Sequence, residues 1–239
     1  MQADLTTYKN SLIQDGFAII ENVFSEAEVN NIINFIEAQA LGIAEKKNKD
    51  VFAIRKLFTA LPGIKEKIFN NNIKRIIEQL FGPNYFITKG IYFDKPALSN
   101  WFVAYHQDIS IAVGNKNNSP LFKGWTVKEN AFGVEPPLQI LESIFTIRIH
   151  LDNCTAANGA LHVITGSHKN GVQTAKDVMQ VKNKKVVCEV PKGGVMLMRP
   201  LLMHSSHKST IDESRRVLHI EFSNASLPDA IDWAEKDFF

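Results

Sequence analysis

The first part of the chain carries apolar residues at helical spacing. The earliest of these helices ends at the Asp15–Gly16 pair, before a strand-like run over residues 17–24. The sequence SEAE then places Glu28 three residues after Ser25, which is the spacing of a capping box at the start of a second helix. A third helix is expected over residues 65–82, because a Gly-Pro pair closes the apolar pattern there.

From residue 85 onward the pattern changes to short β-like runs separated by turn residues. These runs are YFITKGIYF, FVAYHQDISIAV, SIFTIRIHL, ALHVIT, KVVCEV, GVMLMR and RVLHIEF. Short strands after a helical start predict a mainly β fold with helices (α+β), a barrel or sandwich with the helices packed outside it. We interpret residues 1–239 as one domain, with helical support over 1–84, a β core over 85–224 and a C-terminal segment over 225–239.

One segment inside the β region lacks any period. Residues 115–137, NKNNSPLFKGWTVKENAFGVEPP, are polar and contain Gly and Pro, so we expect a long loop. A loop of this length inside a compact domain is usually functional or mobile. Because it follows the HQD sequence directly, it is a candidate lid.

The composition is that of an ordinary globular protein and argues against several classes of partner. The 239 residues are 45% hydrophobic and 22% charged, and 27 Lys and Arg residues against 25 Asp and Glu residues give a formal net charge of +2. This near balance leaves no basic excess for nucleic acid or for a membrane surface. No apolar run approaches the roughly 18 residues needed to cross a bilayer.

The cysteines and the N-terminal residues bear on the compartment. Two cysteines, Cys154 and Cys188, are too few for a disulfide framework. The first residues, MQADLTTYKNSLIQDG, carry neither the basic nor the apolar region of a secretory signal. We therefore expect a cytoplasmic protein, and the sequence leaves its oligomeric state open.

The stretch AYHQDISIAV alternates apolar and polar residues and is expected to be one strand, in which His106 and Asp108 share a face. An imidazole and a carboxylate on one face form half of a metal site. A chain of this composition holds a His-x-Asp/Glu pattern about 0.7 times by chance. The sequence contains three such patterns, His106-x-Asp108, His150-x-Asp152 and His219-x-Glu221. We therefore expect at most one of them to bind a metal.

A third ligand on another strand would distinguish the true site. Two histidines and one carboxylate on one octahedral face leave three positions open for substrate and oxygen. His204 or His207, after the apolar run GVMLMRPLLM, offers that ligand. The doublet Arg215–Arg216 follows on the next strand, where alternation lets only one guanidinium face inward to bind a carboxylate. This combination suits a metal site whose cosubstrate is a dicarboxylate.

Taken together, these sequences resemble a known family. They are HQD in a strand, LDNCTAANGALHVITGSHKNG in the middle, HSS followed by an arginine, and the N-terminal DGFAIIENVFSEAEV. The combination resembles the phytanoyl-CoA dioxygenase family of iron(II)- and 2-oxoglutarate-dependent oxygenases over nearly the whole chain. The resemblance implies a double-stranded β-helix, which is a cupin-like jelly-roll barrel with supporting N-terminal helices.

The resemblance also assigns residues. His106 and Asp108 match the proximal ligands of Fe(II), and His204 matches the distal ligand. Three further assignments concern the cosubstrate 2-oxoglutarate: Arg215 matches the arginine that binds its distal carboxylate, Ser206 matches a hydroxyl that assists this arginine, and Arg148 stands where many members carry an aromatic residue facing the cosubstrate. The implied reaction uses O2 to hydroxylate a C–H bond of a small molecule, and it releases succinate and CO2. Members that halogenate lack the carboxylate at the position of Asp108, so its presence favours hydroxylation.

Two other functions remain open at the level of sequence. The same residues in a jelly-roll could bind zinc or no metal, and the cavity would then serve as a non-catalytic binding module. A hydrolytic metalloenzyme that activates a bound water is the third possibility. The arginine after the distal histidine argues against the binding module, because such a module needs no dicarboxylate clamp.

The remaining polar residues have simpler interpretations. His150 and Asp152 precede a turn and are expected to be structural. His219 and Glu221 share the face of Arg215, but a histidine in a β run is more often a hydrogen-bonded core residue. Two single residues, Lys95 and His207, are expected to be exposed, the latter facing solvent or substrate.

Overall fold

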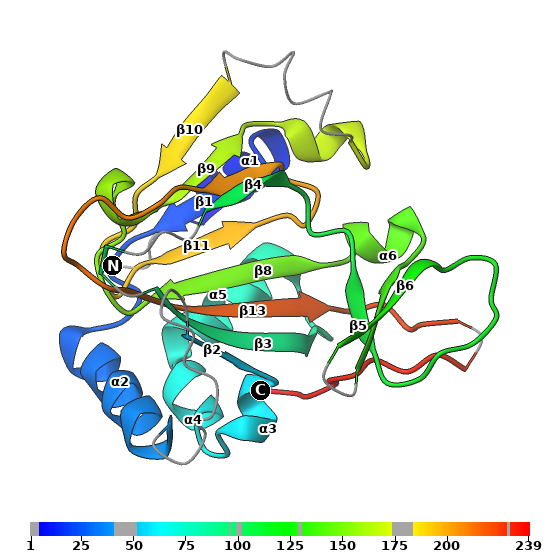
Figure 1. The fold of residues 1–239 in the computed structure, drawn as a ribbon, viewed down its shortest axis with the longest axis horizontal. Helices are drawn as coiled ribbons and strands as arrows, with labels where there is room; N and C mark the ends of the chain where they lie inside the picture. Colours follow the sequence, from blue (N-terminus) through cyan, green and yellow to red (C-terminus); the bar gives the residue numbers. More distant parts are fainter. Residues whose placement is uncertain are drawn as a thin grey trace.

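The computed structural model describes residues 5–40, 52–95, 97–98, 102–128, 131–173, 184–228 and 230–239. Its strands form three antiparallel sheets (Figure 1). The six-stranded sheet has the order β1 (Phe17–Ile20), β11 (Val195–Met198), β8 (Phe145–His150), β13 (Arg215–Ser223), β3 (Phe86–Lys95) and β2 (Phe52–Arg55). The four-stranded sheet has the order β10 (Lys185–Cys188), β9 (Leu161–Ile164), β12 (His204–Ser206) and β4 (Val103–His106). The third sheet has the order β5 (Ile111–Val113), β7 (Ala131–Glu135) and β6 (Lys123–Lys128).

The helices lie mainly in the first third of the chain. They are α1 (Thr6–Gln14), α2 (Glu26–Ala40), α3 (Leu57–Ala60), α4 (Lys65–Ile68), α5 (Asn71–Phe81) and the later α6 (Leu138–Glu142), with 3-10 turns at Ala156–Asn158 and Ser167–Asn170. Apolar side chains of α2 and α5, such as Ile32 and Ile76, pack against the outward-facing residues of the six-stranded sheet, such as Ile147 and Phe222. Burial of this face is the main force that holds helices and sheet together. No helix among the described residues is both long and apolar enough to cross a membrane.

The capping box predicted before α2 is present. Glu28 Oε2 accepts the N–H of Ser25 at 2.8 Å, and the N–H of Glu28 donates to Ser25 Oγ at 3.3 Å. The expected third helix is instead two helices, α4 and α5. Asn70 breaks it because its side chain accepts the N–H of Ile73 at 3.0 Å and so begins a new helix at Asn71.

The loop predicted over residues 115–137 is wrong in its main part. The segment contains β6 and β7, which pair with each other and with β5 in the third sheet. The alternation in AFGVE explains this, because Val134 is fully buried against α6 and the C-terminal segment while its neighbours face outward. The candidate lid is thus a hairpin that belongs to a sheet.

The single strand expected over AYHQDISIAV is also wrong. β4 ends at His106, and β5 begins only at Ile111. The N–H of Asp108 donates to Pro200 O at 2.9 Å in place of a partner in a strand ladder. His106 and Asp108 therefore do not share the face of one strand, although they still meet.

The two larger sheets face each other, and the space between them has two unlike ends. At one end an apolar cluster joins β9, β10 and β11 and includes the free, buried thiols of Cys154 and Cys188. At the other end β3, β8 and β13 face β4 and β12 across a cavity of about 290 Å³. The inward positions there are polar, because Arg148, Arg215 and His219 alternate with apolar residues that face the helices. The fold thereby places these inward-facing polar residues at one end of the space between the two larger sheets.

Candidate active site

Two histidines from neighbouring strands face each other in the cavity. His106 of β4 and His204 of β12 are cross-strand partners, and their ring centroids lie 4.2 Å apart. Each Nδ1 lies 2.9 Å from the carbonyl oxygen two residues earlier, that of Ala104 or Leu202. A carbonyl only accepts, so each Nδ1 carries the proton and each Nε2 keeps a free lone pair. This is the arrangement that metal-binding histidines use.

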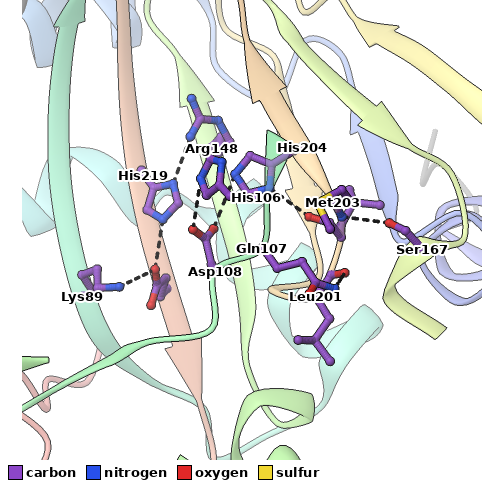
Figure 2. Close-up of polar contacts among 12 residues, drawn as sticks. Lys89, His106, Gln107, Asp108, Arg148, Ser167, Leu201, Met203, His204 and His219 are labelled. Atoms are coloured by element: carbon purple, nitrogen blue, oxygen red, sulfur yellow. Dashed lines mark hydrogen bonds and ion pairs between the residues drawn. The ribbon is translucent and has the colours of Figure 1, made fainter. Parts of the chain in front are cut away.

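Asp108 completes a group of three potential ligands (Figure 2). Its Oδ1 lies 3.8 Å from His106 Nε2 and its Oδ2 lies 3.8 Å from His204 Nε2. All three ligand atoms lie within 4.8 Å of one another. Oδ2 is buried and has no hydrogen-bond partner among the described residues. A divalent cation between the three atoms would satisfy this oxygen and both lone pairs, so the donor set fits Fe(II).

Gln107 holds this constellation in place. Its Nε2 donates to Leu201 O at 2.6 Å and to Gly171 O at 2.9 Å. These two bonds join the turn after β4 to the segments that precede β12 and follow the second 3-10 turn. Figure 2 shows Gln107 extending away from Asp108, so the residue between the two proposed ligands is structural.

The protonation states suit metal binding. Burial lowers the pKa of His204 to about 4, although Asp108 opposes the shift, so this imidazole is neutral near pH 7. Burial also opposes ionisation of Asp108, but its electrostatic interactions with His204, His219 and Lys89 outweigh burial and hold the pKa of Asp108 below its ordinary value. The site therefore offers one carboxylate and a neutral imidazole without deprotonation by the metal.

The structure brings all six predicted site residues to one cavity, which His106, Asp108, His204, Ser206, Arg148 and Arg215 line. Arg148 and Arg215 are each 7% exposed, and the Nε atom of each is buried without a partner in the described part of the chain. A buried guanidinium with an unused donor is costly unless an anion binds it. The cavity therefore fits a carboxylate ligand next to the His-Asp-His group.

Ser206 has a different hydrogen-bond partner from the one that the family resemblance implies. Its Oγ donates to Gly159 O at 3.2 Å, and it has no hydrogen bond to Arg215 in the described structure. A different residue accompanies this arginine. Lys95, expected to be exposed, is 3% exposed and pairs with Arg215 across β3 and β13.

The ammonium group of Lys95 contributes a positive charge to the cavity lining. Burial and then the charge of Arg215 lower the pKa of Lys95 to about 8. Gly159 has φ 89°, and a Cβ atom there would lie 2.6 Å from Lys95 Nζ. Glycine at this position thus leaves room for the ammonium group, which donates to His207 O.

A chain of polar contacts crosses the cavity wall beside Asp108. Arg148 NH1 lies 3.0 Å from His219 Nδ1, His219 Nε2 lies 3.2 Å from Glu221 Oε1, and Lys89 Nζ lies 2.7 Å from the same oxygen (Figure 2). The sequence favours a place in the core for His219 and Glu221. In the structure both line the cavity, and they are hydrogen-bonded to each other.

The atoms of Asp108, His219 and Glu221 lie close enough to hold a second metal ion. The hydrogen bonds argue against it. An arginine only donates, so His219 Nδ1 accepts and the proton lies on Nε2, which faces Glu221. The ammonium group of Lys89 already neutralises that carboxylate.

The other candidate residues lie outside the group. His207 is exposed and stacks on His162 with ring centroids 4.0 Å apart, so it is no rival to His204. His150 is buried, and neither of its ring nitrogens has a partner among the described residues. Asp152 accepts from Arg216, whose side chain lies on the helix-covered face of the sheet.

A second cavity of about 380 Å³ adjoins the first. Arg55, Lys89, Ile91 and Asp108 line both. Its other walls come from β5, the β6–β7 hairpin and the C-terminal segment. That segment runs back along β3 and β5, with bridges at Ile87↔Asp237 and Val113↔Trp233. No local sequence signal pointed to these walls.

Comparisons with known proteins agree with this geometry. The sequence profile described as phytanoyl-CoA dioxygenase (PhyH) matches residues 12–217. None of the curated protein sequences matches the chain. Among solved structures, SnoK, a non-heme alpha ketoglutarate dependent carbocyclase from nogalamycin biosynthesis, has a TM-score of 0.72 at 15% identity, over 94% of this chain and 85% of SnoK.

Two further structures are similar. EctD from S. alaskensis has a TM-score of 0.69 at 17% identity, over 93% of this chain and 77% of EctD. AviO1 from Streptomyces viridochromogenes Tue57 has a TM-score of 0.67 at 16% identity, over 96% of this chain and 99% of AviO1. EctD structures exist with bound Fe and with 2-oxoglutarate and 5-hydroxyectoine. The predicted fold class, mainly β with helices and of the jelly-roll type, is confirmed, but the sheets are not closed into a barrel.

Proposed function

We propose that this chain, which belongs to the phytanoyl-CoA dioxygenase (PhyH) family and is a non-haem iron- and 2-oxoglutarate-dependent oxygenase, hydroxylates a C–H bond of a small molecule and releases succinate and CO2. The observation that carries the proposal is the single cavity that joins the His106, Asp108 and His204 ligand atoms to two buried guanidinium groups, each with an Nε atom that has no partner among the described residues. Fe(II) held by these ligands supplies oxygen activation coupled to decarboxylation of 2-oxoglutarate.

The residues of the chain bind and orient the reactants. His106, Asp108 and His204 would hold Fe(II) as three ligands, so coordination positions would stay open for 2-oxoglutarate and O2. Arg215 binds the distal carboxylate of 2-oxoglutarate, and Lys95 beside it adds a second positive charge. Binding the two ends of one molecule fixes its orientation and so lowers the entropic part of the barrier.

Arg148 and Ser206 complete the proposed cosubstrate site. Arg148 interacts electrostatically with Asp108 and His204 and is fixed through His219, so its Nε would be available to donate to a bound 2-oxoglutarate. Ser206 keeps Gly159 in place through its hydrogen bond and thereby positions Lys95. The protein's main contribution is a dry pocket with its charges already arranged.

The location and domain organisation are part of the same proposal. Both cysteines are buried free thiols, which suits a reducing cytoplasm. We propose that residues 1–239 act as one domain, because the strands within residues 1–84 join the same sheet as β8, β11 and β13.

The test is a coupled assay on the full chain with Fe(II), 2-oxoglutarate and O2. We expect succinate formation that depends on Fe(II) and consumes O2, and we expect His106→Ala to lose it while His207→Ala, which changes an exposed histidine directly after β12, retains it. A zinc-bound protein that hydrolyses substrate without O2 uptake, or a folded protein that yields no succinate above the His106→Ala level, would contradict the proposal.

A further inference from the structure

The two adjoining cavities carry an excess of positive charge. Six cationic side chains line them, Arg55, Lys56, Lys89, Lys95, Arg148 and Arg215, against three carboxylates, Asp108, Glu221 and Glu235. The whole chain has a formal net charge of only +2. The positive charge is therefore concentrated at this one place, which favours anionic ligands.

The cosubstrate accounts for only part of this excess. Lys95, Arg148 and Arg215 line the first cavity alone, on the side proposed for 2-oxoglutarate. Lys89 is neutralised by Glu221 at 2.7 Å. The two cations left over both line the second cavity, and Arg55 lines the first cavity as well.

These remaining cations are Arg55, the last residue of β2, and Lys56, which follows it. Neither side chain has an ion pair or a hydrogen bond to the described residues. Lys56 has φ 49° and ψ 52°, a left-handed conformation that is uncommon for a residue with a Cβ atom. Such strain persists where the surrounding structure fixes a side chain in place, and it gathers at binding sites.

Glu235, the carboxylate that interacts with Lys56, does not neutralise the positive charge of the basic pair. Glu235 accepts the N–H of Gly90, and Lys56 and Lys89 are the charged neighbours that favour its ionisation, whereas Glu221 opposes it. Burial outweighs these effects and raises the pKa of Glu235 to about 7, so much of this group is neutral near pH 7.

The rest of the second cavity is apolar. Its walls include Ile91, Ile109, Ile111, Phe132 and Ala234. The same cavity is lined by Asp108, at the proposed metal site, and by the basic pair at the end of β2. The apolar wall suits a hydrocarbon body of a ligand, because such a body gains free energy when it leaves water.

We propose that the substrate is an amphipathic anion whose carboxylate or phosphate group binds Arg55 and Lys56, while its apolar body lies along the second cavity toward Asp108. This inference rests on the proposed function, since it assigns the substrate class of the same site. The basic pair fixes one end of the molecule, and the distance from that end to the metal selects the carbon that reacts.

Ligand-observed NMR on the metal-free full chain, saturated with 2-oxoglutarate, tests this inference. The probes are octanoate, octyl phosphate, octan-1-ol and octylamine, which share one chain and differ in the head group. We expect the anions to bind at least about tenfold more tightly than the alcohol or the amine. Comparison of the two anions identifies which head group the site prefers.

The variant Arg55→Ala/Lys56→Asn should reduce that preference to within about twofold, since asparagine tolerates the left-handed backbone at this position. The matched control Lys9→Ala/Lys74→Ala removes the same charge at two exposed lysines outside the cavities and should keep the preference. Equal binding of all four probes, or a preference lost in Arg215→Ala but kept in Arg55→Ala/Lys56→Asn, overturns the inference. Failure of the proposed function would show separately, as the absence of succinate in the coupled assay.

Discussion

Arg215 and Arg216 are consecutive residues of β13 whose guanidinium groups lie on opposite faces of the six-stranded sheet. Arg215 lines the cavity, and its Nε has no partner among the described residues. Arg216 binds Asp152 through Nε and NH2 at 2.9 and 2.8 Å, and it reaches Glu37 of α2 at 3.0 Å. Arg216 therefore attaches α2 to the sheet, whereas we propose that Arg215 binds a ligand in the cavity.

This relationship gives two opposite expectations. Arg215→Ala should weaken 2-oxoglutarate binding by about tenfold or more and leave the melting temperature nearly unchanged, because a charge-assisted carboxylate contact is lost. Arg216→Ala should keep the affinity and lower the free energy of unfolding by about 1 to 3 kcal/mol, because Asp152 loses its partner. Calorimetric titration and thermal melts measure both quantities. If both variants lost affinity equally, the assignment of Arg215 would be wrong.

The pKa of Lys95 gives a pH dependence to cosubstrate binding. Burial and Arg215 lower this pKa to about 8, so raising the pH through that value removes a positive charge beside the proposed carboxylate site. We expect the affinity for 2-oxoglutarate to fall by about tenfold between about pH 7 and about pH 9. In Lys95→Met the affinity should be lower at about pH 7 and should no longer fall. An unchanged slope in this variant would assign the titration to another group.

Glu235 gives a pH dependence to stability. Burial raises its folded-state pKa from 4.5 to about 7, so its contribution to stability is complete below 4.5 and is lost as the pH rises through about 7. Glu235→Gln removes this loss and should gain about 1 to 3 kcal/mol relative to wild type at about pH 8, and nothing at about pH 4. Urea unfolding at both pH values measures the difference. The exposed control Glu78→Gln should show no such change, and a similar gain in both variants would argue against the burial of Glu235.

Two ion pairs of nearly equal length should differ in strength because they differ in burial. The Lys89–Glu221 pair is 2.7 Å long with side chains 22% and 7% exposed, whereas Lys65–Asp237 is 2.8 Å long with side chains 32% and 42% exposed. Lys89→Met leaves a buried carboxylate and should cost about 3 to 5 kcal/mol. Lys65→Met should cost about 1 kcal/mol or less.

Denaturant unfolding measures both costs. The double variant Lys89→Met/Glu221→Leu should recover part of the loss seen in Lys89→Met, because no buried charge is then left alone. Equal losses for Lys89→Met and Lys65→Met would show that the cavity around Glu221 is open to water.

The sequence predicted the parts of the site that depend on local pattern. Strand alternation separated Arg215 from Arg216, and the spacing of the family's motifs led to His106, Asp108 and His204, which the structure brings into one group. The capping box before α2 could also be predicted from the sequence, because its donor and acceptor lie within one helical turn.

The features of the site and the fold that depend on long-range strand pairing could not be predicted from the sequence. Lys95 becomes a cavity residue only through its register with Arg215 across β3 and β13. Glu235 reaches the cavity because the C-terminal segment returns along β3. The pattern predicts a loop where β6 and β7 form a hairpin, because the alternation in AFGVE is short and polar residues surround it.

We propose that His106, Asp108 and His204, which are distant in the sequence, bind one ferrous ion together with 2-oxoglutarate. Anaerobic titration of the full chain with Fe(II) and 2-oxoglutarate measures this directly through the visible charge-transfer band of the chelate. We expect a band that saturates at one iron per chain, disappears in His106→Ala and in His204→Ala, and persists in His207→Ala. A folded wild-type protein that binds Fe(II) and 2-oxoglutarate without this band, or a band that persists in His204→Ala, would contradict the claim.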